Sequence, residues 1–181
     1  MTMKIYEHLP LVESILNERA QVIGSQFQPY KNHVYRVLNF CFAFHDCHGD
    51  EQEKLIIAAC FHDLGMWPGD VVDYLAPSIL LAQSYLSQRG KSDWSAEISE
   101  IIDLHHKFRS VSNSQFPLVE VFRKGDWVDA TMGLRRFGLP RSDVKAVQSA
   151  FANLGFHNNL IRLAWGEFKR CPFNPLPMMK W

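Results

Sequence analysis

Hydrophobic residues recur at intervals of three to four positions along most of the chain, whereas the strict alternation that is typical of strands is scarce. This period predicts an all-α fold. Segments with Gly and Pro, such as Gly138-Leu139-Pro140, separate the periodic stretches because these residues end helices. The helices are predicted at residues 8–24, 31–47, 52–64, 77–89, 94–108, 116–133, 141–153 and 157–170.

The sequence has no internal repeat and no linker long enough to divide it. Its 181 residues, 47% of them hydrophobic and 21% charged, are enough for one sizeable core. We therefore expect a single domain over residues 1–181. The Pro-rich stretch 171–181 is incompatible with a helix. Its aromatic and Met residues suit an extended segment that packs on the domain or on a second copy in a homodimer, and a frayed end is the alternative.

Charge and hydropathy narrow the range of partners. Lys and Arg together number 19, as do Asp and Glu, so the formal net charge is zero. No run of basic residues offers the positive surface that a nucleic-acid polymer or an anionic membrane requires. The sequence also lacks an apolar stretch of about 18 residues for a membrane span and an apolar signal region near its start. These features favour a cytoplasmic protein that acts on small molecules.

Two carboxylates and a histidine lie on apolar faces of the predicted helices. His33 shares a face with Val37, which follows at i+4. Asp126 follows Phe122 by four positions in the segment 116–133, and Asp129 lies one turn further. We therefore expect these polar side chains to point toward the core.

Two further polar pairs lie where apolar runs end. The pair His62-Asp63 closes the apolar part of the segment 52–64. In the segment 94–108, His105 follows Ile98 by seven positions and so points inward, whereas His106 lies at the edge of the same face. Both pairs are therefore predicted at the ends of buried helices.

A carboxylate that points into the core must be stabilised by a nearby cation, hydrogen-bond donor or proton. An ionised carboxylate buried alone is costly, and the sequence offers few inward Lys or Arg residues. A single inward His is more often a hydrogen-bonded core residue than a ligand. Several such placements together favour a divalent cation instead, since imidazole nitrogen and carboxylate oxygen are ligands of Mn, Fe, Co, Ni and Zn, with Mg as a further candidate. We expect His62 and Asp63 to share such an ion.

The order of these residues carries a family resemblance. His33, then His62-Asp63, then Asp126 on successive helices resembles the H…HD…D signature of the HD superfamily of metal-dependent phosphohydrolases. The resemblance covers about residues 20–135, and the C-terminal helices and tail at 136–181 follow it. The strings HDLGMWPGDVVDYLAPS, HHKF, FRKGDWVDATMG and NPLPMMKW are similar to an uncharacterised bacterial branch of that superfamily, whose members are described as predicted phosphohydrolases.

The resemblance implies a fold and a set of ligands. The fold would be a single-domain, HD-type helical bundle. The ligands of one ion would be His33, His62, Asp63 and Asp126, with Asp63 able to bridge to a second ion. His105 and His106 are the candidates for holding that second ion or for a catalytic role, so the number of ions is left at one or two.

Two departures from common forms of the family bear on the chemistry. Met66 stands where many members have the lysine of an HDIGK sequence, and no Glu follows the pair as a general acid or base. Asp70 or Asp73 could take that role, although an Asp in such a loop is also typical of a turn or cap. The candidates for binding phosphate, each of which also fits a solvated surface position, are Arg36, Lys107 and Lys124.

The resemblance implies hydrolysis of a small phosphomonoester or phosphodiester, such as a nucleotide. The ion would lower the pKa of a bound water toward about 7 and hold a phosphoryl oxygen. Asp63 would be catalytic by orienting that water. The leaving oxygen would be protonated from His105, His106 or Lys107.

Two other functions fit the same residues. The superfamily also includes hydratases and di-iron oxygenases, and a fold does not fix the reaction. A non-catalytic, metal-stabilised, ligand-sensing domain would explain why neither Lys nor Glu follows the His-Asp pair. An enzyme site should keep a coordination position open, whereas a purely structural site should not.

Overall fold

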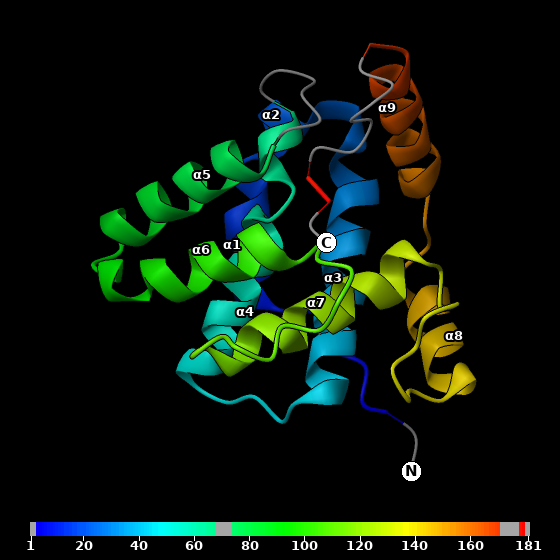
Figure 1. The fold of residues 1–181 in the computed structure, drawn as a ribbon, viewed down its shortest axis with the longest axis horizontal. Helices are drawn as coiled ribbons and strands as arrows, with labels where there is room; N and C mark the ends of the chain where they lie inside the picture. Colours follow the sequence, from blue (N-terminus) through cyan, green and yellow to red (C-terminus); the bar gives the residue numbers. More distant parts are fainter. Residues whose placement is uncertain (1–2, 68–73, 171–177, 180–181) are drawn as a thin grey trace.

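The computed structural model describes residues 3–67, 74–170 and 178–179, which form helices and no strand (Figure 1). The all-α prediction is confirmed. The helices are α1 (Pro10–Asn17), α2 (Ala20–Ile23), α3 (Phe27–Phe44), α4 (Asp50–Phe61), α5 (Leu75–Gln88), α6 (Ser95–Leu104), α7 (Pro117–Ala130), α8 (Arg141–Ala150) and α9 (Phe156–Arg170).

Every predicted segment contains a helix, and the differences lie at the boundaries. The segment 8–24 is divided into α1 and α2. Helix α3 begins at Phe27, four residues before the predicted start, and Pro29 is accommodated in its first turn, where the backbone N–H groups need no helical partner. It ends when His45 takes an extended conformation, with φ −145° and ψ 126°.

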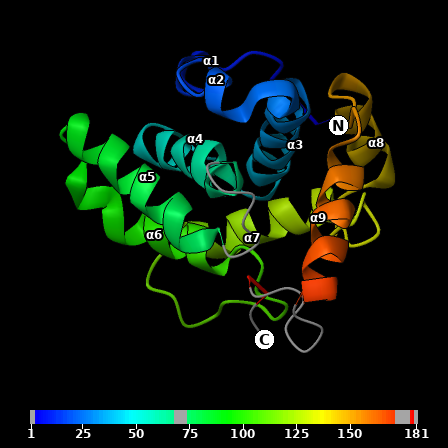
Figure 2. The same ribbon diagram turned by 90° about the horizontal axis from the view of Figure 1, so that it is seen from above.

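Helices α3 and α7 cross at short range near the middle of the fold (Figure 2). Gly125 of α7 allows this approach. A Cβ atom at that position would lie 2.6 Å from Sγ of Cys41 and 3.0 Å from the carbonyl oxygen of Val37, both on α3. The close crossing brings the next residue of α7, Asp126, toward α3.

The remaining helices complete a bundle around this crossing. Helices α5 and α6 run side by side (Figures 1 and 2). Helix α4 contacts α3, α6 and α7, so the four helices α3, α4, α6 and α7 surround one buried region. Helix α9 packs against α3. The four central helices carry the inward polar residues predicted above.

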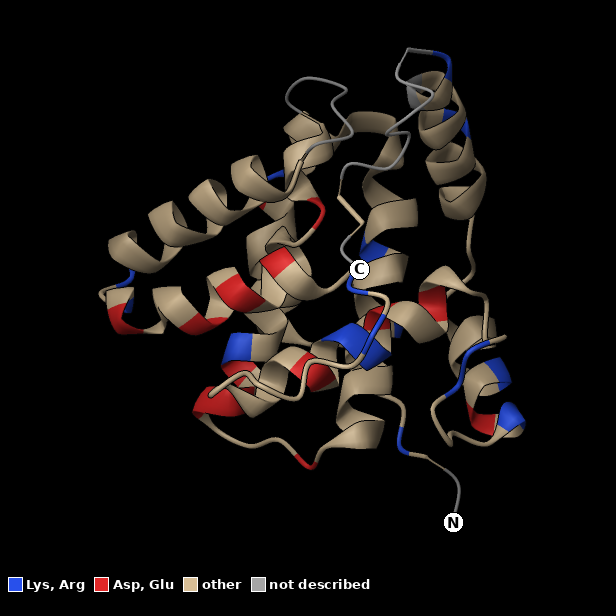
Figure 3. Cartoon of the chain, viewed as in Figure 1, with Lys and Arg blue, Asp and Glu red and all other residues tan. Residues whose placement is uncertain are grey.

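The surface of the described chain is mixed in charge. Figure 3 shows Lys and Arg interspersed with Asp and Glu along the helices. None of the helices in the described part combines the length and apolar character needed to cross a membrane.

Candidate metal centre

Two of the central helices end at the polar pairs. Helix α4 ends at Phe61, and the N–H of His62 donates to the carbonyl of Ala58 at 2.8 Å. Helix α6 ends at Leu104, directly before His105. Both imidazoles are 0% exposed. The ends of α4 and α6 thus deliver their histidines to the interior, as the sequence predicted.

The turn after His62-Asp63 depends on Gly65. Its N–H donates to Oγ of Ser78 at 2.9 Å. A Cβ atom at Gly65 would lie 2.5 Å from the carbonyl oxygen of Tyr74 and 2.8 Å from the amide nitrogen of Ser78. Only glycine therefore lets the start of α5 lie against this turn and brings Tyr74 beside the cluster.

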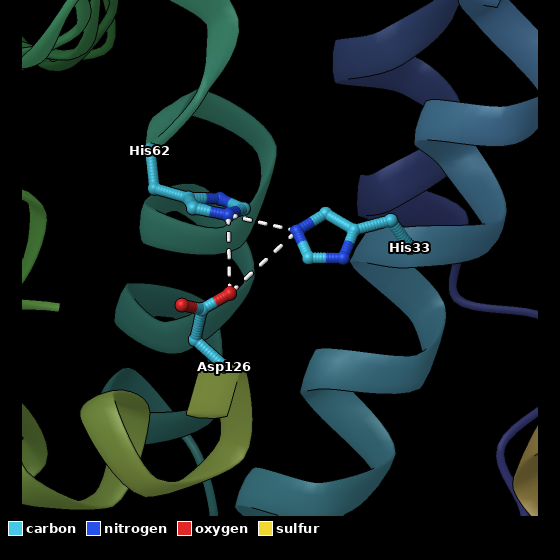
Figure 4. Close-up of side chains that lie close together, drawn as sticks. All are labelled: His33, His62 and Asp126. Carbon is cyan, nitrogen blue, oxygen red and sulfur yellow. Dashed lines mark hydrogen bonds and ion pairs between the residues drawn. The ribbon is translucent and has the colours of Figure 1, made fainter. Parts of the chain in front are cut away.

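His33, His62 and Asp126 meet at the centre, each from a different segment (Figure 4). The Nε2 atoms of His33 and His62 lie 3.0 Å apart. Oδ1 of Asp126 lies 3.7 Å from Nε2 of His33 and 3.8 Å from Nε2 of His62. These distances suit three ligands that surround one small ion.

Asp63 lies between this group and a second one. Its Oδ2 atom is 3.3 Å from Nε2 of His62 and 3.6 Å from Nε2 of His33. Its Oδ1 atom is 3.6 Å from Nε2 of His105. The two carboxylate oxygens therefore face different histidines.

The two carboxylate oxygens of Asp126 also face different histidines. Oδ1 faces His33 and His62, whereas Oδ2 lies 3.9 Å from Nδ1 of His106. Two further sets of possible ligands follow, namely His62 with Asp63 and His105, and His105 with His106 and Asp126. The cluster joins all six residues that the sequence singled out as ligands or catalytic histidines.

The inner hydrogen bonds fix which nitrogen of each deep histidine faces the cluster. His33 Nδ1 lies 2.7 Å from Oδ2 of Asp129. His62 Nδ1 lies 2.8 Å from the carbonyl of Ala59, and His105 Nδ1 lies 2.6 Å from the carbonyl of Ile102. Because these oxygens accept, each Nδ1 carries a hydrogen, so in the uncharged ring that binds a metal each Nε2 presents a lone pair to the centre.

The centre is therefore built from acceptors. Three Nε2 atoms and two carboxylates converge, and both Nε2 of His105 and Oδ1 of Asp63 are buried without a hydrogen-bond partner among the described residues. Such orphaned atoms are costly in an interior. A divalent cation satisfies them together, and its usual ligand histidines donate their other N–H to an oxygen in this manner. The residues present fit a metal ion.

Burial and neighbouring charges shift the protonation of these groups. Burial lowers the pKa of His33 to about 4, although the Asp129 carboxylate opposes the shift. Burial, together with the neighbouring carboxylates, raises the pKa of Asp126 to about 7 against the effect of His105. Burial alone would raise the pKa of Asp63, but His62 and His105 hold it well below its ordinary value. One carboxylate of the pair is thus readily protonated and the other is not.

Asp129 and Arg36 form a buried pair behind His33. Nε of Arg36 donates to Oδ1 of Asp129 at 2.5 Å, and Nη2 donates to Oδ2 at 2.9 Å. Nη1 donates to the carbonyl of Phe151 at 3.0 Å. Arg36 is only 2% exposed. The interpretation of Arg36 as a phosphate ligand is therefore wrong, because its donors are used to hold Asp129 against His33.

His106 lies at the rim, as predicted. Its side chain is 18% exposed. Nε2 lies 2.6 Å from the hydroxyl of Tyr74, a partner that the sequence did not identify. Burial keeps the pKa of His106 well below and that of Tyr74 well above their ordinary values, so both are uncharged near neutral pH.

The other candidates lie elsewhere. Lys124 is on the outer side of α7, where it lies 3.9 Å from Glu120 and over the ring of Phe44. The main-chain carbonyl of Lys107 accepts bonds from Arg123 and Trp127, and Lys107 does not line the pocket at the cluster. Asp70 and Asp73 lie outside the described residues, so their suggested acid–base role stays a prediction.

A pocket of about 210 Å³ opens onto the cluster. Its inner end is formed by His33, Asp63, His106 and Asp126. Residues of α9 form much of its wall, a contribution that the sequence did not reveal. Met178 lines it as well and packs against Met66 and Tyr74, so this part of the tail lies on the domain; most of the tail lies outside the described residues.

Comparisons with known proteins identify one match. The family model described as HD domain matches residues 30–131, which include most of α3 and all of α4, α5, α6 and α7, with the whole cluster. No curated protein and no solved structure matches the chain.

Proposed function

The chain belongs to the HD domain family, and from this premise we propose that it is a metal-dependent hydrolase of a small phosphate ester. The observation that carries the proposal is the buried convergence of acceptor atoms on one point. Within the part of the chain that the structure describes, two of those atoms, Nε2 of His105 and Oδ1 of Asp63, have no hydrogen-bond partner. A structural core network would pair them, whereas a metal centre needs them free.

The proposal assigns two neighbouring positions for ions. His33 and His62 would hold the first, together with Oδ1 of Asp126 and Oδ2 of Asp63. His105, with Oδ1 of Asp63 and Oδ2 of Asp126, would hold the second. The division of both carboxylates between two sets of nitrogens supports this assignment. Nitrogen and oxygen ligands suit Mn, Fe, Co, Ni or Zn, and the choice among them stays open.

When bound, divalent ions at such a site lower the pKa of a coordinated water toward about 7 and draw charge from phosphoryl oxygens. In the reaction the water oxygen would lose a proton and form a bond to phosphorus, the bond from phosphorus to the leaving oxygen would break, and the proton released by the water would pass through solvent to the leaving oxygen. Asp63, at the base of the pocket, would orient the attacking water through its carboxylate.

His106 is the residue best suited to stabilise the leaving oxygen. It lines the pocket, whereas His105 does not. If the Tyr74 hydroxyl donates to Nε2 of His106, then Nδ1 carries the hydrogen and faces the cluster. The leaving oxygen would then accept a hydrogen bond from this Nδ1–H, which would stabilise the charge that develops on that oxygen.

A second candidate is chemistry on an uncharged substrate, such as hydration or iron-dependent oxygenation. The observation that favours it is the pocket wall, where the described lining residues include no Lys or Arg to bind a phosphate. Oxygen uptake by the iron-loaded protein, without ester hydrolysis, would favour this candidate. The open pocket argues against a purely structural metal site, because such a site needs no access for a ligand.

The test compares Asp63→Asn with Asp50→Asn, an exposed acid in the first turn of α4. Each protein is loaded with Mn²⁺, desalted, and assayed for metal per chain and for hydrolysis of p-nitrophenyl phosphate and its bis ester. We expect about one or two ions per wild-type chain, with metal affinity at least about 10–100-fold weaker in Asp63→Asn and turnover abolished. Asp50→Asn should match wild type. Equal turnover by Asp63→Asn would refute the proposed function.

A further inference from the structure

The pocket above the cluster has two chemically different ends. The inner end carries the acceptor atoms of His33, Asp63 and Asp126. The remaining wall is largely apolar, with side chains from four parts of the chain. These are Met66, Ala130, Phe156, Leu160, Leu163 and Met178.

The polar groups elsewhere in the wall are already engaged. The Tyr74 hydroxyl is bonded to His106. Nε2 of His157 donates to the main-chain carbonyl of Asp129 at 2.8 Å, and its Nδ1 accepts from the side-chain amide of Asn153. The wall therefore offers few free donors or acceptors to the hydroxyl groups of a sugar or the edge of a nucleobase, and leaving those groups unpaired would be costly.

The described part of the wall also lacks positive charge. Among the described residues that line the pocket there is no Lys or Arg. The nearby Arg36 is held by Asp129 behind His33, and Arg162 of α9 donates to Asn159 at an exposed position. Metal ions at the inner end could neutralise one phosphate group, but a second or third phosphate further out would meet an apolar wall.

We infer that the substrate is the monophosphate ester of a small, uncharged, largely apolar alcohol, whose hydrocarbon part lies against α9 while its phosphate faces the cluster. This inference rests on the proposed function and narrows it, because it disfavours nucleotides and sugar phosphates. At about 210 Å³ the pocket is smaller than the ~300–1,000 Å³ that drug-sized ligands occupy. The alcohol is accordingly short or carries a single ring.

The test measures binding separately from turnover. Calorimetry on the Mn²⁺-loaded protein uses n-alkyl phosphonates from methyl to octyl, which cannot be hydrolysed, with ribose 5-phosphate and adenosine monophosphate for comparison. We expect affinity to rise about fourfold for each of the first few methylene groups and then to level off when the pocket is full. The sugar phosphate and the nucleotide should bind no more tightly than methylphosphonate.

A matched pair of variants on α9 locates the effect. Leu163 lines the pocket, whereas Trp165, two positions further, is 58% exposed and does not. Leu163→Gln should reduce the preference for hexylphosphonate over methylphosphonate about four- to tenfold. Trp165→Gln should leave that preference unchanged. Helix content and the melting temperature of both variants establish that they are folded.

The outcomes separate this inference from the proposed function. Equal affinity along the phosphonate series, with hydrolysis of simple esters, would overturn the inference and leave the hydrolase proposal standing. A rising series without turnover of any ester would support the apolar pocket and overturn the proposed hydrolysis. Tighter binding of adenosine monophosphate than of hexylphosphonate would overturn the inference directly.

Discussion

Nδ1 of His33 lies 2.7 Å from Oδ2 of Asp129, and this bond between α3 and α7 decides which nitrogen of His33 faces the cluster. Asp129 is itself held by the guanidinium of Arg36 in a two-point pair. The three side chains are thus linked by hydrogen bonds, and of the three only His33 lines the pocket at the cluster. The ligand character of His33 thus depends on a carboxylate that does not face the pocket.

Replacement of Asp129 should weaken both metal binding and the fold. In Asp129→Asn the buried Arg36 loses its counter-charge, which should cost about 3–5 kcal/mol of unfolding free energy. The amide can also turn its NH₂ toward His33, so metal affinity should fall about 10–100-fold. Chelator competition and denaturant unfolding measure the two effects.

The control for this variant is Glu13→Gln. Glu13 pairs with Lys31 at 3.1 Å in a partly exposed position, so its loss should cost at most about 1 kcal/mol and leave the metal affinity unchanged. Unaltered metal affinity in Asp129→Asn would show that Asp129 does not orient His33.

Two glycines should respond in opposite directions to the same change. Gly65→Ala places a Cβ atom 2.5 Å from the carbonyl oxygen of Tyr74, so the turn after the His-Asp pair must move. This movement should lower the free energy of unfolding by about 1–3 kcal/mol. A Cβ atom at Gly166 in α9 would have no neighbouring atom within 4 Å, so Gly166→Ala should raise the free energy of unfolding by about 0.5–1 kcal/mol. Thermal unfolding distinguishes them, and metal content should fall only in Gly65→Ala. A neutral Gly65→Ala would contradict the close packing of this turn.

The raised pKa of Asp126 predicts a pH dependence of metal binding. With a pKa of about 7 instead of 3.8, Asp126 of the folded, metal-free protein keeps its proton up to neutral pH. Because the folded protein binds this proton more tightly than the unfolded chain, the proton adds to the unfolding free energy of the metal-free protein at acid pH. This added stability is lost as pH rises through about 7. An ion must displace the proton, so Mn²⁺ affinity should fall by up to about tenfold per pH unit below 7.

Carboxyl NMR of the metal-free protein tests the assignment directly. Asp126 should titrate near pH 7, whereas Asp129, whose pKa His33 and Arg36 hold well below its ordinary value against the effect of burial, should remain ionised to strongly acid pH. Constant Mn²⁺ affinity between pH 5.5 and 7, an interval that begins about 1.5 units below this pKa and ends near it, would argue against the assignment.

Tyr74→Phe tests the role of His106. Loss of the hydroxyl removes the group that fixes the tautomer of His106, so kcat should fall about tenfold while the metal content stays at the wild-type level. Tyr35→Phe is the matched control, because its hydroxyl bonds Glu13 and the N–H of Leu9 and is not part of the pocket. Loss of metal in Tyr74→Phe would instead identify His106 as a ligand.

Helix periodicity predicted the all-α fold because the spacing of apolar residues is a local property that packing preserves. The same periodicity placed His33, His105 and Asp126 on inward faces, where the structure has them buried. Helix boundaries were less accurate, as at α3, since the first and last turns depend on contacts with other segments.

The sequence by itself determined the helices and the inward direction of the cluster's residues, because both follow from the rotation of a helix. It did not determine the partners. Arg36 and Asp129 are 93 positions apart, so only the tertiary structure turns a candidate phosphate ligand into a buried counter-ion. Likewise, the pocket is lined by α9, which lies beyond the family match, and by Tyr74. Tertiary packing decides which polar atoms are left unpaired, and those atoms mark the centre.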